Sequence, residues 1–279
     1  MGVGLSPGFG FGVIFGSGLG TTERDRRTIL RIVASVFLGL TLLCALLGFV
    51  AGLGLPRPIH LLLARSPGAG SVGGIAPPGR PPALPVEPVS AASGRFGALP
   101  LAALTGLVCA LLAWRLGPGL DLLAFLVLAV AGVTLAVVDM RALRLPDPVL
   151  LVTLATGLTL LGMESLALGD FTAYRRALLG GVTLAGYHLC LAALFRGSLG
   201  MGDVKLAGVL GIHLTWLGWG VLVTGAFLAV LLAGLTAGAL ILVGRARRDS
   251  RLPFGPWLLL GALGGVLCGA ELSRLHLAW

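Results

Sequence analysis

Long apolar runs alternate with short polar segments along most of the chain. A helix that crosses a bilayer takes about 20 mainly apolar residues, and eight runs reach or approach that length. Their predicted bounds are 32–55, 99–116, 122–138, 149–168, 177–195, 204–217, 219–243 and 254–272. The pattern therefore predicts an all-α, polytopic membrane protein with about eight transmembrane helices.

The stretch 204–243 is open to two interpretations, because it is too long for one crossing and short for two. One crossing would place Asp203 and the arginine-rich loop 244–252 on opposite faces of the membrane, whereas two crossings would place them on the same face. We prefer two crossings, since a short helix can lie among neighbouring helices instead of against lipid.

The segments outside the spans divide the chain into four predicted parts. These are an N-terminal tail (1–31), a first transmembrane helix (32–55), a loop rich in Pro and Gly (56–96), and a helical region (97–279). The loop has too few apolar residues to fold alone. The Gly-rich residues 1–21 are given no structure and no role.

Composition supports a membrane environment and removes one class of partner. The chain is 57% hydrophobic and 11% charged, with a mean hydropathy of +1.01. Its net charge of +9 comes mainly from arginines in short loops beside apolar runs, where membrane topology and anionic lipid headgroups account for them. We therefore expect contact with lipid and none with nucleic acid. The four cysteines form no C-x-x-C pair and the four histidines have no ligand spacing, so neither metal nor cofactor is expected.

Two aspartates stand at the ends of predicted helices. Asp139 ends the span 122–138, the next two spans leave that face of the membrane and return to it, and Asp203 begins the span 204–217. The two carboxyl groups are therefore predicted to meet at one face. Basic residues are more numerous on this face (Arg141, Arg144, Arg196, Lys205, Arg245, Arg247, Arg248, Arg251) than on the other (Arg115, Arg175, Arg176, Arg274). The excess predicts that the aspartates face the cytoplasm.

Two neighbouring carboxyl groups can hydrolyse a peptide bond without a metal. Like-charge repulsion and desolvation favour one protonated and one ionised group, so that one takes a proton from water while the other polarises the carbonyl. Which aspartate is protonated stays open, because the pair titrates as a unit. A simpler interpretation is that each aspartate ends a helix and is satisfied by a nearby basic residue. The partner would be Arg141 or Arg144 for Asp139 and Lys205 for Asp203. A proton-coupled transporter is a further alternative.

Three motifs narrow these alternatives. The run Gly200-Met201-Gly202-Asp203-Val204-Lys205-Leu206 matches G-x-G-D-x-K-L, residues 137–147 place Asp139 before a Leu-Pro-Asp turn, and residues 253–257 read Pro-Phe-Gly-Pro-Trp. In this order the motifs resemble those of the type IV prepilin peptidases, which are GxGD intramembrane aspartyl proteases.

This resemblance implies a function and a site. The expected activity is cleavage of the basic leader of a type IV prepilin or pseudopilin before its hydrophobic helix, for a pilus or a type II secretion system. Asp139 and Asp203 would be the catalytic pair, within a core of six helices at the cytoplasmic face of a bacterial inner membrane. Gly200, Gly202, Lys205 and Asp147 would bind substrate or support the site. The sequence does not indicate an oligomeric state.

The loop 56–96 departs from the pattern of the family. Many bacterial members carry there a cytoplasmic zinc-binding domain with two C-x-x-C pairs, associated with N-methylation of the mature pilin. This loop has no cysteine, so the resemblance implies a cytoplasmic loop without zinc and a peptidase without methyltransferase activity. An inactive pilus or secretion assembly protein is a remaining alternative, but it would be expected to lack one of the aspartates.

Overall fold

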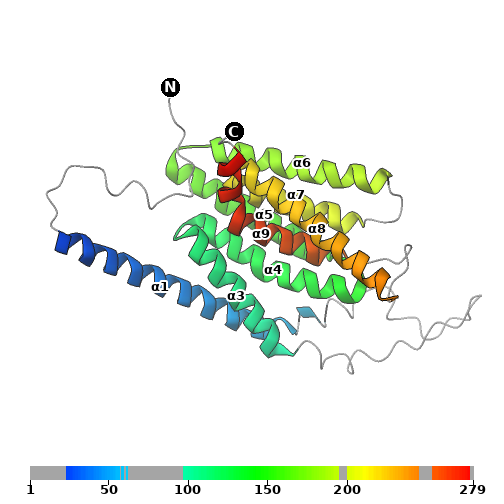
Figure 1. The fold of residues 1–279 in the computed structure, drawn as a ribbon, viewed down its shortest axis with the longest axis horizontal. Helices are drawn as coiled ribbons and strands as arrows, with labels where there is room; N and C mark the ends of the chain where they lie inside the picture. Colours follow the sequence, from blue (N-terminus) through cyan, green and yellow to red (C-terminus); the bar gives the residue numbers. More distant parts are fainter. Residues whose placement is uncertain are drawn as a thin grey trace, which may run out of the picture.

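The computed structural model describes residues 23–56, 58–59, 61, 97–194, 200–244 and 253–276. Within this part of the chain the structure has eight long helices and no strand (Figure 1), which confirms the predicted all-α class. The helices are α1 (Glu23–Gly54), α3 (Ala98–Leu116), α4 (Leu120–Ala142), α5 (Asp147–Leu168), α6 (Thr172–Leu194), α7 (Met201–Leu217), α8 (Trp219–Leu242) and α9 (Gly255–His276).

Five of these helices are long and apolar enough to cross a membrane: α3, α4, α5, α6 and α8. The apolar parts of α1 (Leu38–Gly54) and α9 (Gly255–Gly269) are shorter. The chain is therefore a multi-pass membrane protein. Most of the predicted loop 56–96 and of the predicted tail, and the arginine-rich segment 245–252, lie outside the described residues.

Each predicted run corresponds to a helix, but α1 and α6 begin earlier than predicted, α6 at Thr172 instead of residue 177. The division of 204–243 into two helices is confirmed, and Gly218 separates α7 from α8 with a φ of 145°, a conformation that glycine adopts without a steric penalty. Helix α1 begins at Glu23, before the predicted start at residue 32. Its charged first turns continue the helix because Arg and Glu are good helix formers.

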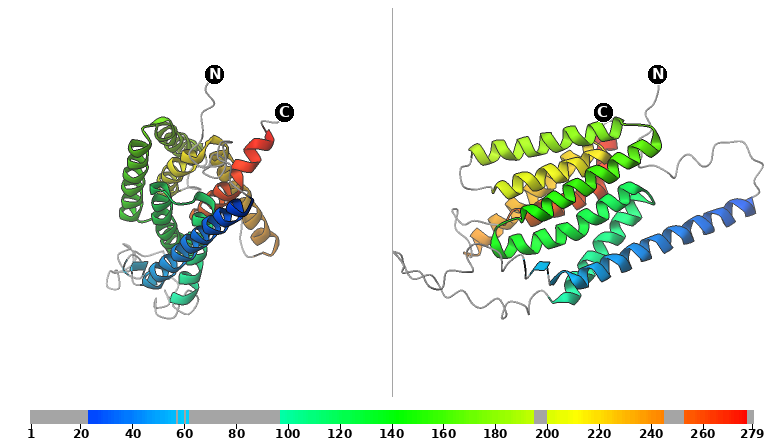
Figure 2. Two further views of the ribbon diagram at one scale, coloured as in Figure 1. Left: turned by 90° about the vertical axis from the view of Figure 1, so that its left-hand side faces the viewer. Right: turned by 180° about the vertical axis from the view of Figure 1, so that it is seen from behind.

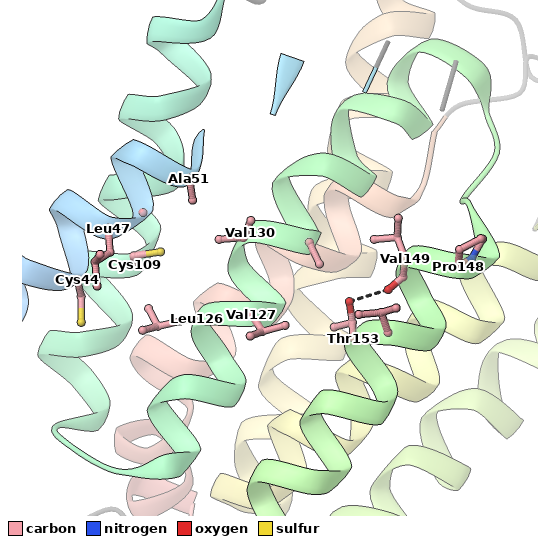
Figure 3. Close-up of a pocket in the computed structure, with 13 residues that line it drawn as sticks. Cys44, Leu47, Ala51, Cys109, Leu126, Val127, Val130, Pro148, Val149 and Thr153 are labelled. Atoms are coloured by element: carbon pink, nitrogen blue, oxygen red, sulfur yellow. Dashed lines mark hydrogen bonds between the residues drawn. The ribbon is translucent and has the colours of Figure 1, made fainter. Parts of the chain in front are cut away.

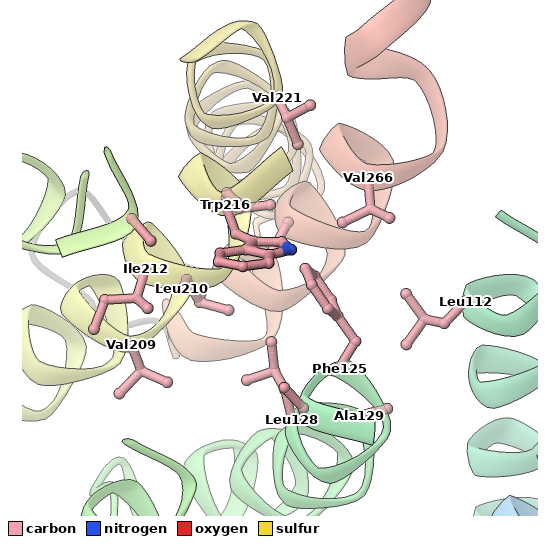
Figure 4. Close-up of a cluster of buried hydrophobic side chains, with 14 of the residues drawn as sticks. Leu112, Phe125, Leu128, Ala129, Val209, Leu210, Ile212, Trp216, Val221 and Val266 are labelled. Atoms are coloured by element: carbon pink, nitrogen blue, oxygen red, sulfur yellow. The ribbon is translucent and has the colours of Figure 1, made fainter. Parts of the chain in front are cut away.

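The helices differ in how much protein surrounds them. Over its most apolar stretch α4 is 67% buried, whereas α8 is 11% buried, and most residues of α7 are also buried. Between α4 and α7 the core contains Phe125, Leu210 and Trp216 (Figure 4). Helix α1 lies along α3, and α6 lies along α7 (Figures 1 and 2). The two aspartates singled out by the sequence therefore belong to the two innermost helices.

Side-chain contacts show which helix ends lie together. At one end, here named the aspartate end, α4 stops and α5, α7 and α9 begin; Lys205 contacts Asp147, and Gly255 contacts Asp139. At the opposite end α3, α5 and α7 stop and α4 and α6 begin. There Glu164 contacts the backbone of Leu120, and the Arg176 side chain donates to the carbonyl oxygens at the end of α7. The predicted meeting of Asp139 and Asp203 at one end of the bundle is thus observed.

Candidate active site

Asp139 lies in the last turn of α4 and is 5% exposed. Its Oδ2 accepts a hydrogen bond of 3.0 Å from the backbone N–H of Gly255, the first residue of α9. Leu143, which follows the last residue of α4, caps the helix, and its N–H donates to the Asp139 carbonyl oxygen. The Asp139 carboxyl is therefore held between the end of one helix and the beginning of another.

Asp203 lies in the first turn of α7 and is 8% exposed. Its Oδ2 accepts a hydrogen bond of 3.2 Å from the N–H of Gly200, the residue that caps the helix. Carboxylates at this position commonly satisfy a free N–H at a helix start. Its Oδ1, in contrast, is a buried oxygen without a hydrogen-bond partner among the described residues.

The carboxyl groups of Asp139 and Asp203 are close enough to repel each other electrostatically. Both lie in a part of the protein where few water molecules can screen them, so a state with both groups ionised is costly. One shared proton relieves the repulsion, and a free Asp203 Oδ1 can contact a water molecule or a substrate carbonyl. The arrangement can therefore donate a proton and accept one at the same place.

The basic residue next to Asp203 does not neutralise it. Lys205 Nζ lies 2.7 Å from Asp147 Oδ1, and these two side chains are 50% and 67% exposed. The suggestion that Lys205 satisfies Asp203 is therefore wrong, because the Lys205 side chain points outward to the start of α5. The ion pair connects the first residue of α5 to the first turn of α7.

The predicted glycines have different surroundings. A Cβ atom on Gly202 would lie 2.9 Å from the Leu145 Cβ, so this glycine allows the α4–α5 turn to pack on α7. Gly200 is exposed, and a Cβ there would meet only Asp203 Oδ2 and the N–H of Gly202 within 4 Å. Close approach of a substrate backbone stays a prediction, and Gly200 is the position with room for it.

Sequence reasoning did not assign a role to Gly255. The Pro-Phe-Gly-Pro-Trp motif at 253–257 supported the resemblance, but neither spacing nor composition connects it with Asp139, which is 116 residues away. The available signal was the motif itself: a glycine between two prolines at a helix start. The packing of α9 against α4 brings it to the site.

No metal-binding cluster is present in the described part of the chain, where no three His, Cys, Asp or Glu side chains come together. The two buried histidines, His188 and His213, each bond through Nδ1 to a carbonyl oxygen four residues earlier in their own helix. The His213 ring packs edge-on against Phe125. Both histidines therefore pack within the helix bundle.

A cavity of about 600 Å³ lies away from the two carboxyl groups, among α1, α3, α4 and α5 (Figure 3). Its wall is apolar, and its one hydroxyl group, on Thr153, donates to the Val149 carbonyl oxygen. Labelled residues around it are Cys44, Leu47, Ala51, Cys109, Leu126, Val127, Val130, Pro148, Val149 and Thr153. The wall of the cavity contains no carboxyl, imidazole or amino side chain.

Comparison with known proteins agrees with the motifs. Residues 126–242, which include both aspartates, match the family model described as Type IV leader peptidase family. Over these residues the chain is similar to that family, and the resemblance seen in the three motifs is confirmed.

Individual relatives carry the name Prepilin leader peptidase/N-methyltransferase. The chain is 32% identical over 182 residues to the protein of Aeromonas hydrophila, covering 62% of this chain and 59% of that one. It is 37% identical over 187 residues to the protein of Dickeya chrysanthemi, covering 63% and 61%. For Bacillus subtilis (strain 168) the identity is 27% over 163 residues, covering 58% and 62%. The chain thus spans less than two thirds of the length of these relatives, and no solved structure matches it.

Proposed function

We propose that this protein is a membrane-embedded aspartyl endopeptidase that removes the leader peptide of a type IV prepilin or pseudopilin. The single observation that carries the proposal is the pair Asp139 and Asp203. They come from the two innermost helices and reach the same end of the bundle, and Asp203 Oδ1 has no hydrogen-bond partner among the residues that the structure describes. The similarity of residues 126–242 to the type IV leader peptidase family supports the choice of reaction.

The proposed reaction uses water and both carboxyl groups. The ionised carboxyl takes a proton from a water molecule, and the water oxygen bonds to the carbonyl carbon of the scissile peptide. The protonated carboxyl gives its proton to the carbonyl oxygen. When the C–N bond breaks, the new amine takes up the proton first removed from water, and the second carboxyl regains its own. The cleaved chain gains one water and the pair returns to its starting state.

The position of the two aspartates at one end of the bundle also indicates the kind of substrate and the membrane face on which it is cleaved. A leader that precedes an apolar helix remains at the membrane surface, where the aspartate end lies. We infer that this end faces the cytoplasm of a bacterium, because the basic residues of the chain are concentrated on its loops. Labelling of single cysteines placed at Asp147 and at Asp170 with a membrane-impermeant thiol reagent tests this inference. Only the Asp170 position should react from outside intact spheroplasts.

A peptidase without methyltransferase activity is part of the proposal. Its support is the loop 56–96, which contains no cysteine for a zinc site. The relatives carry both activities in their names. The mass of the processed pilin decides the matter: the expected product begins with an unmodified amino group, and a product heavier by one methyl group contradicts this part of the proposal.

Co-expression with a prepilin tests the peptidase activity. The precursor should have a basic leader that ends in glycine, and the N-terminus of the product is sequenced. Wild-type protein should remove the leader, whereas Asp139→Asn and Asp203→Asn should each leave it attached. Asp170→Asn is the matched control, because it removes an exposed carboxylate at the opposite end of the bundle.

The outcomes separate the alternatives. An attached leader in both Asn variants, with normal membrane levels and a processed product in the control, supports the proposal. Processing by either Asn variant contradicts the aspartate pair and favours a transporter or another protease. The same prepilins are also given to a known prepilin peptidase. If that enzyme removes their leaders and the wild-type protein removes none, the proposed activity is contradicted.

A further inference from the structure

We propose that Gly255 is a positioning residue for Asp139, and that the first turn of α9 is a third part of the active site besides the two aspartates. The expected effect on catalysis rests on the proposed function. The contact between Gly255 and Asp139 can be tested without a cleavage assay. Its basis is a single close contact between the backbone of Gly255 and the Asp139 carboxyl group.

The N–H of Gly255 is available for this contact because of where it stands in α9. Phe254 caps the helix, and its carbonyl oxygen accepts the N–H groups of Trp257 and Leu258. The first N–H groups of a helix have no partner within the helix. The N–H of Gly255 is one of these, and it donates to Asp139 Oδ2 at 3.0 Å in a buried setting. The bond fixes one carboxyl oxygen and thereby sets the direction of the other.

The absence of a side chain at this position is equally important. A Cβ atom on Gly255 would lie 2.8 Å from Asp139 Oδ2 and 3.3 Å from Asp139 Cγ. Both distances are shorter than ordinary van der Waals contact, so an alanine would require a movement. The atoms in the way belong to the end of a side chain, so the Asp139 carboxyl is the group that moves. The expected result is a folded protein with a displaced catalytic carboxyl.

Other buried glycines of the bundle contrast with Gly255 in this respect. A Cβ on Gly211 would meet the backbone of α6 at 2.5 Å, and a Cβ on Gly261 would meet the backbone of α8 at 2.5 Å. Alanine at either position would separate two helices and disturb the fold. At Gly255 the conflict is confined to the site, so a substitution can affect catalysis without disrupting helix packing.

A buried aromatic contact holds the start of α9 in place. The ring of Phe254 lies 6.0 Å from the ring of His188 on α6, which is 1% exposed. The His188 ring in turn packs edge-on against Tyr187. The turn that carries Gly255 is therefore attached to α6, the helix that precedes Asp203 in the chain. Helix α6 therefore contacts the turn that binds Asp139 and also leads in sequence to Asp203.

The test compares two glycine substitutions in purified full-length protein. Gly255→Ala is the test variant, and Gly234→Ala on α8 is the matched control, because a Cβ there meets nothing within 4 Å. Cleavage of a purified prepilin gives kcat and KM, and thermal unfolding in detergent gives stability. We expect Gly255→Ala to lower kcat by at least about tenfold, as displacement of a catalytic group does. KM and the unfolding temperature should stay near those of wild type, and Gly234→Ala should match wild type throughout.

A second variant removes the N–H donor in addition to filling the space beside Asp139. Gly255→Pro removes the N–H, and proline is well accepted at the first position of a helix. It should lower kcat at least as much as Gly255→Ala does. Wild-type kcat in both variants would overturn the inference. A fall in the unfolding temperature large enough to account for the lost activity would also overturn it, because Gly255 would then only maintain the fold.

A labelling experiment decides the inference even if no prepilin is cleaved. Protein is treated with a water-soluble carbodiimide and an amine, and the modification of Asp139 is measured by mass spectrometry relative to the exposed Asp147. Release of Asp139 in Gly255→Ala should raise its relative labelling, whereas Gly234→Ala should leave it unchanged. Equal labelling of Asp139 in all three proteins would overturn the inference. Absence of cleavage by wild type would instead count against the proposed function alone.

Discussion

The two ends of the helix bundle each bring two acidic side chains together, and they use them differently. Asp139 and Asp203 meet at the aspartate end, and Asp121 and Glu164 meet at the opposite end. Burial does not distinguish Asp121 from Asp203, since each is 8% exposed, although Glu164 is only partly buried. The difference lies in the hydrogen-bond partners of the carboxylate oxygens.

At the opposite end both carboxylates cap the first turn of α4. Glu164 Oε2 accepts the N–H of Leu120 at 3.0 Å, and Asp121 Oδ1 accepts the N–H of Leu122 at 2.7 Å. These N–H groups have no partner within the helix, so the acids stabilise the helix start. At the aspartate end Asp203 Oδ1 is left without a partner in the described structure. An acidic pair at a helix end therefore does not by itself indicate a site. The buried oxygen that has no partner among the described residues is what sets Asp139 and Asp203 apart from the other pair.

The largest difference between the two ends is expected in the cleavage rate when one aspartate of each pair is replaced by asparagine. Asp203→Asn should lower the rate of leader cleavage by about 10²–10⁴-fold, the usual contribution of a general acid or base. Asp121→Asn should keep cleavage near the wild-type rate, because this residue lies at the other end of α4. Initial rates with a purified prepilin measure both. A cleavage defect in Asp121→Asn as large as that in Asp203→Asn would remove the distinction between the ends.

The free energy of unfolding, in contrast, should depend more on the acidic residues of the opposite end than the cleavage rate does. Glu164→Ala leaves the N–H of Leu120 without its acceptor, and loss of a helix cap costs about 1 kcal/mol. The free energy of unfolding in detergent should fall by about this amount, with little change in the cleavage rate. Leu231→Ala, on the exposed face of α8, is the control for an unrelated helix position. If Glu164→Ala affects cleavage more than stability, the opposite end is part of the catalytic apparatus.

Backbone strain also differs between the ends. At the opposite end the left-handed residue that follows α5 is Gly169, with a φ of 68°, whereas α4 ends at the aspartate end with Leu143, at a φ of 50°. A left-handed conformation costs a non-glycine residue about 1 kcal/mol. Leu143→Gly should therefore stabilise the protein, by about 0.5 kcal/mol after the greater chain entropy of glycine is included. Chemical denaturation in detergent measures the change, and destabilisation would show that packing of the Leu143 side chain outweighs the strain.

The smallest effect is expected at the exposed ion pair. Lys205→Met and Asp147→Asn should each change stability by about 0–1 kcal/mol, because solvent screens pairs of this kind. A double-mutant cycle should give a coupling free energy in that range that decreases as salt is added. Coupling that is larger and insensitive to salt would indicate that the pair is shielded by lipid or by substrate.

The fold could be predicted in large part from the sequence, because each apolar run is long and its ends are marked. Gly117 and Gly169 stand where α3 and α5 stop, and the prolines 146 and 148 stand where α5 starts. Because successive spans cross the membrane in opposite directions, Asp139 and Asp203 were predicted to lie at the same end of the bundle. The early start of α1 was missed because charged residues that flank a span do not show whether the helix continues through them.

The finer structure of the site could not be predicted in this way. Lys205 is two positions from Asp203, yet it pairs with Asp147 because successive positions of a helix point in different directions. The contact between Gly255 and Asp139 depends on how α9 packs against α4, and no local pattern encodes that packing. The lengths and ends of the apolar runs thus determine the helices, whereas partners within the site arise from tertiary contacts.

The central claim, that Asp139 and Asp203 act as a unit, is tested most directly by cleavage rates of the two single Asn variants and the double variant. Purified proteins are compared on one prepilin substrate, with Asp121→Asn as the folded control. Residues that act together are not additive, so each single variant should lose as much activity as the double variant. Losses that multiply in the double variant, or substantial activity in either single variant, would contradict the claim.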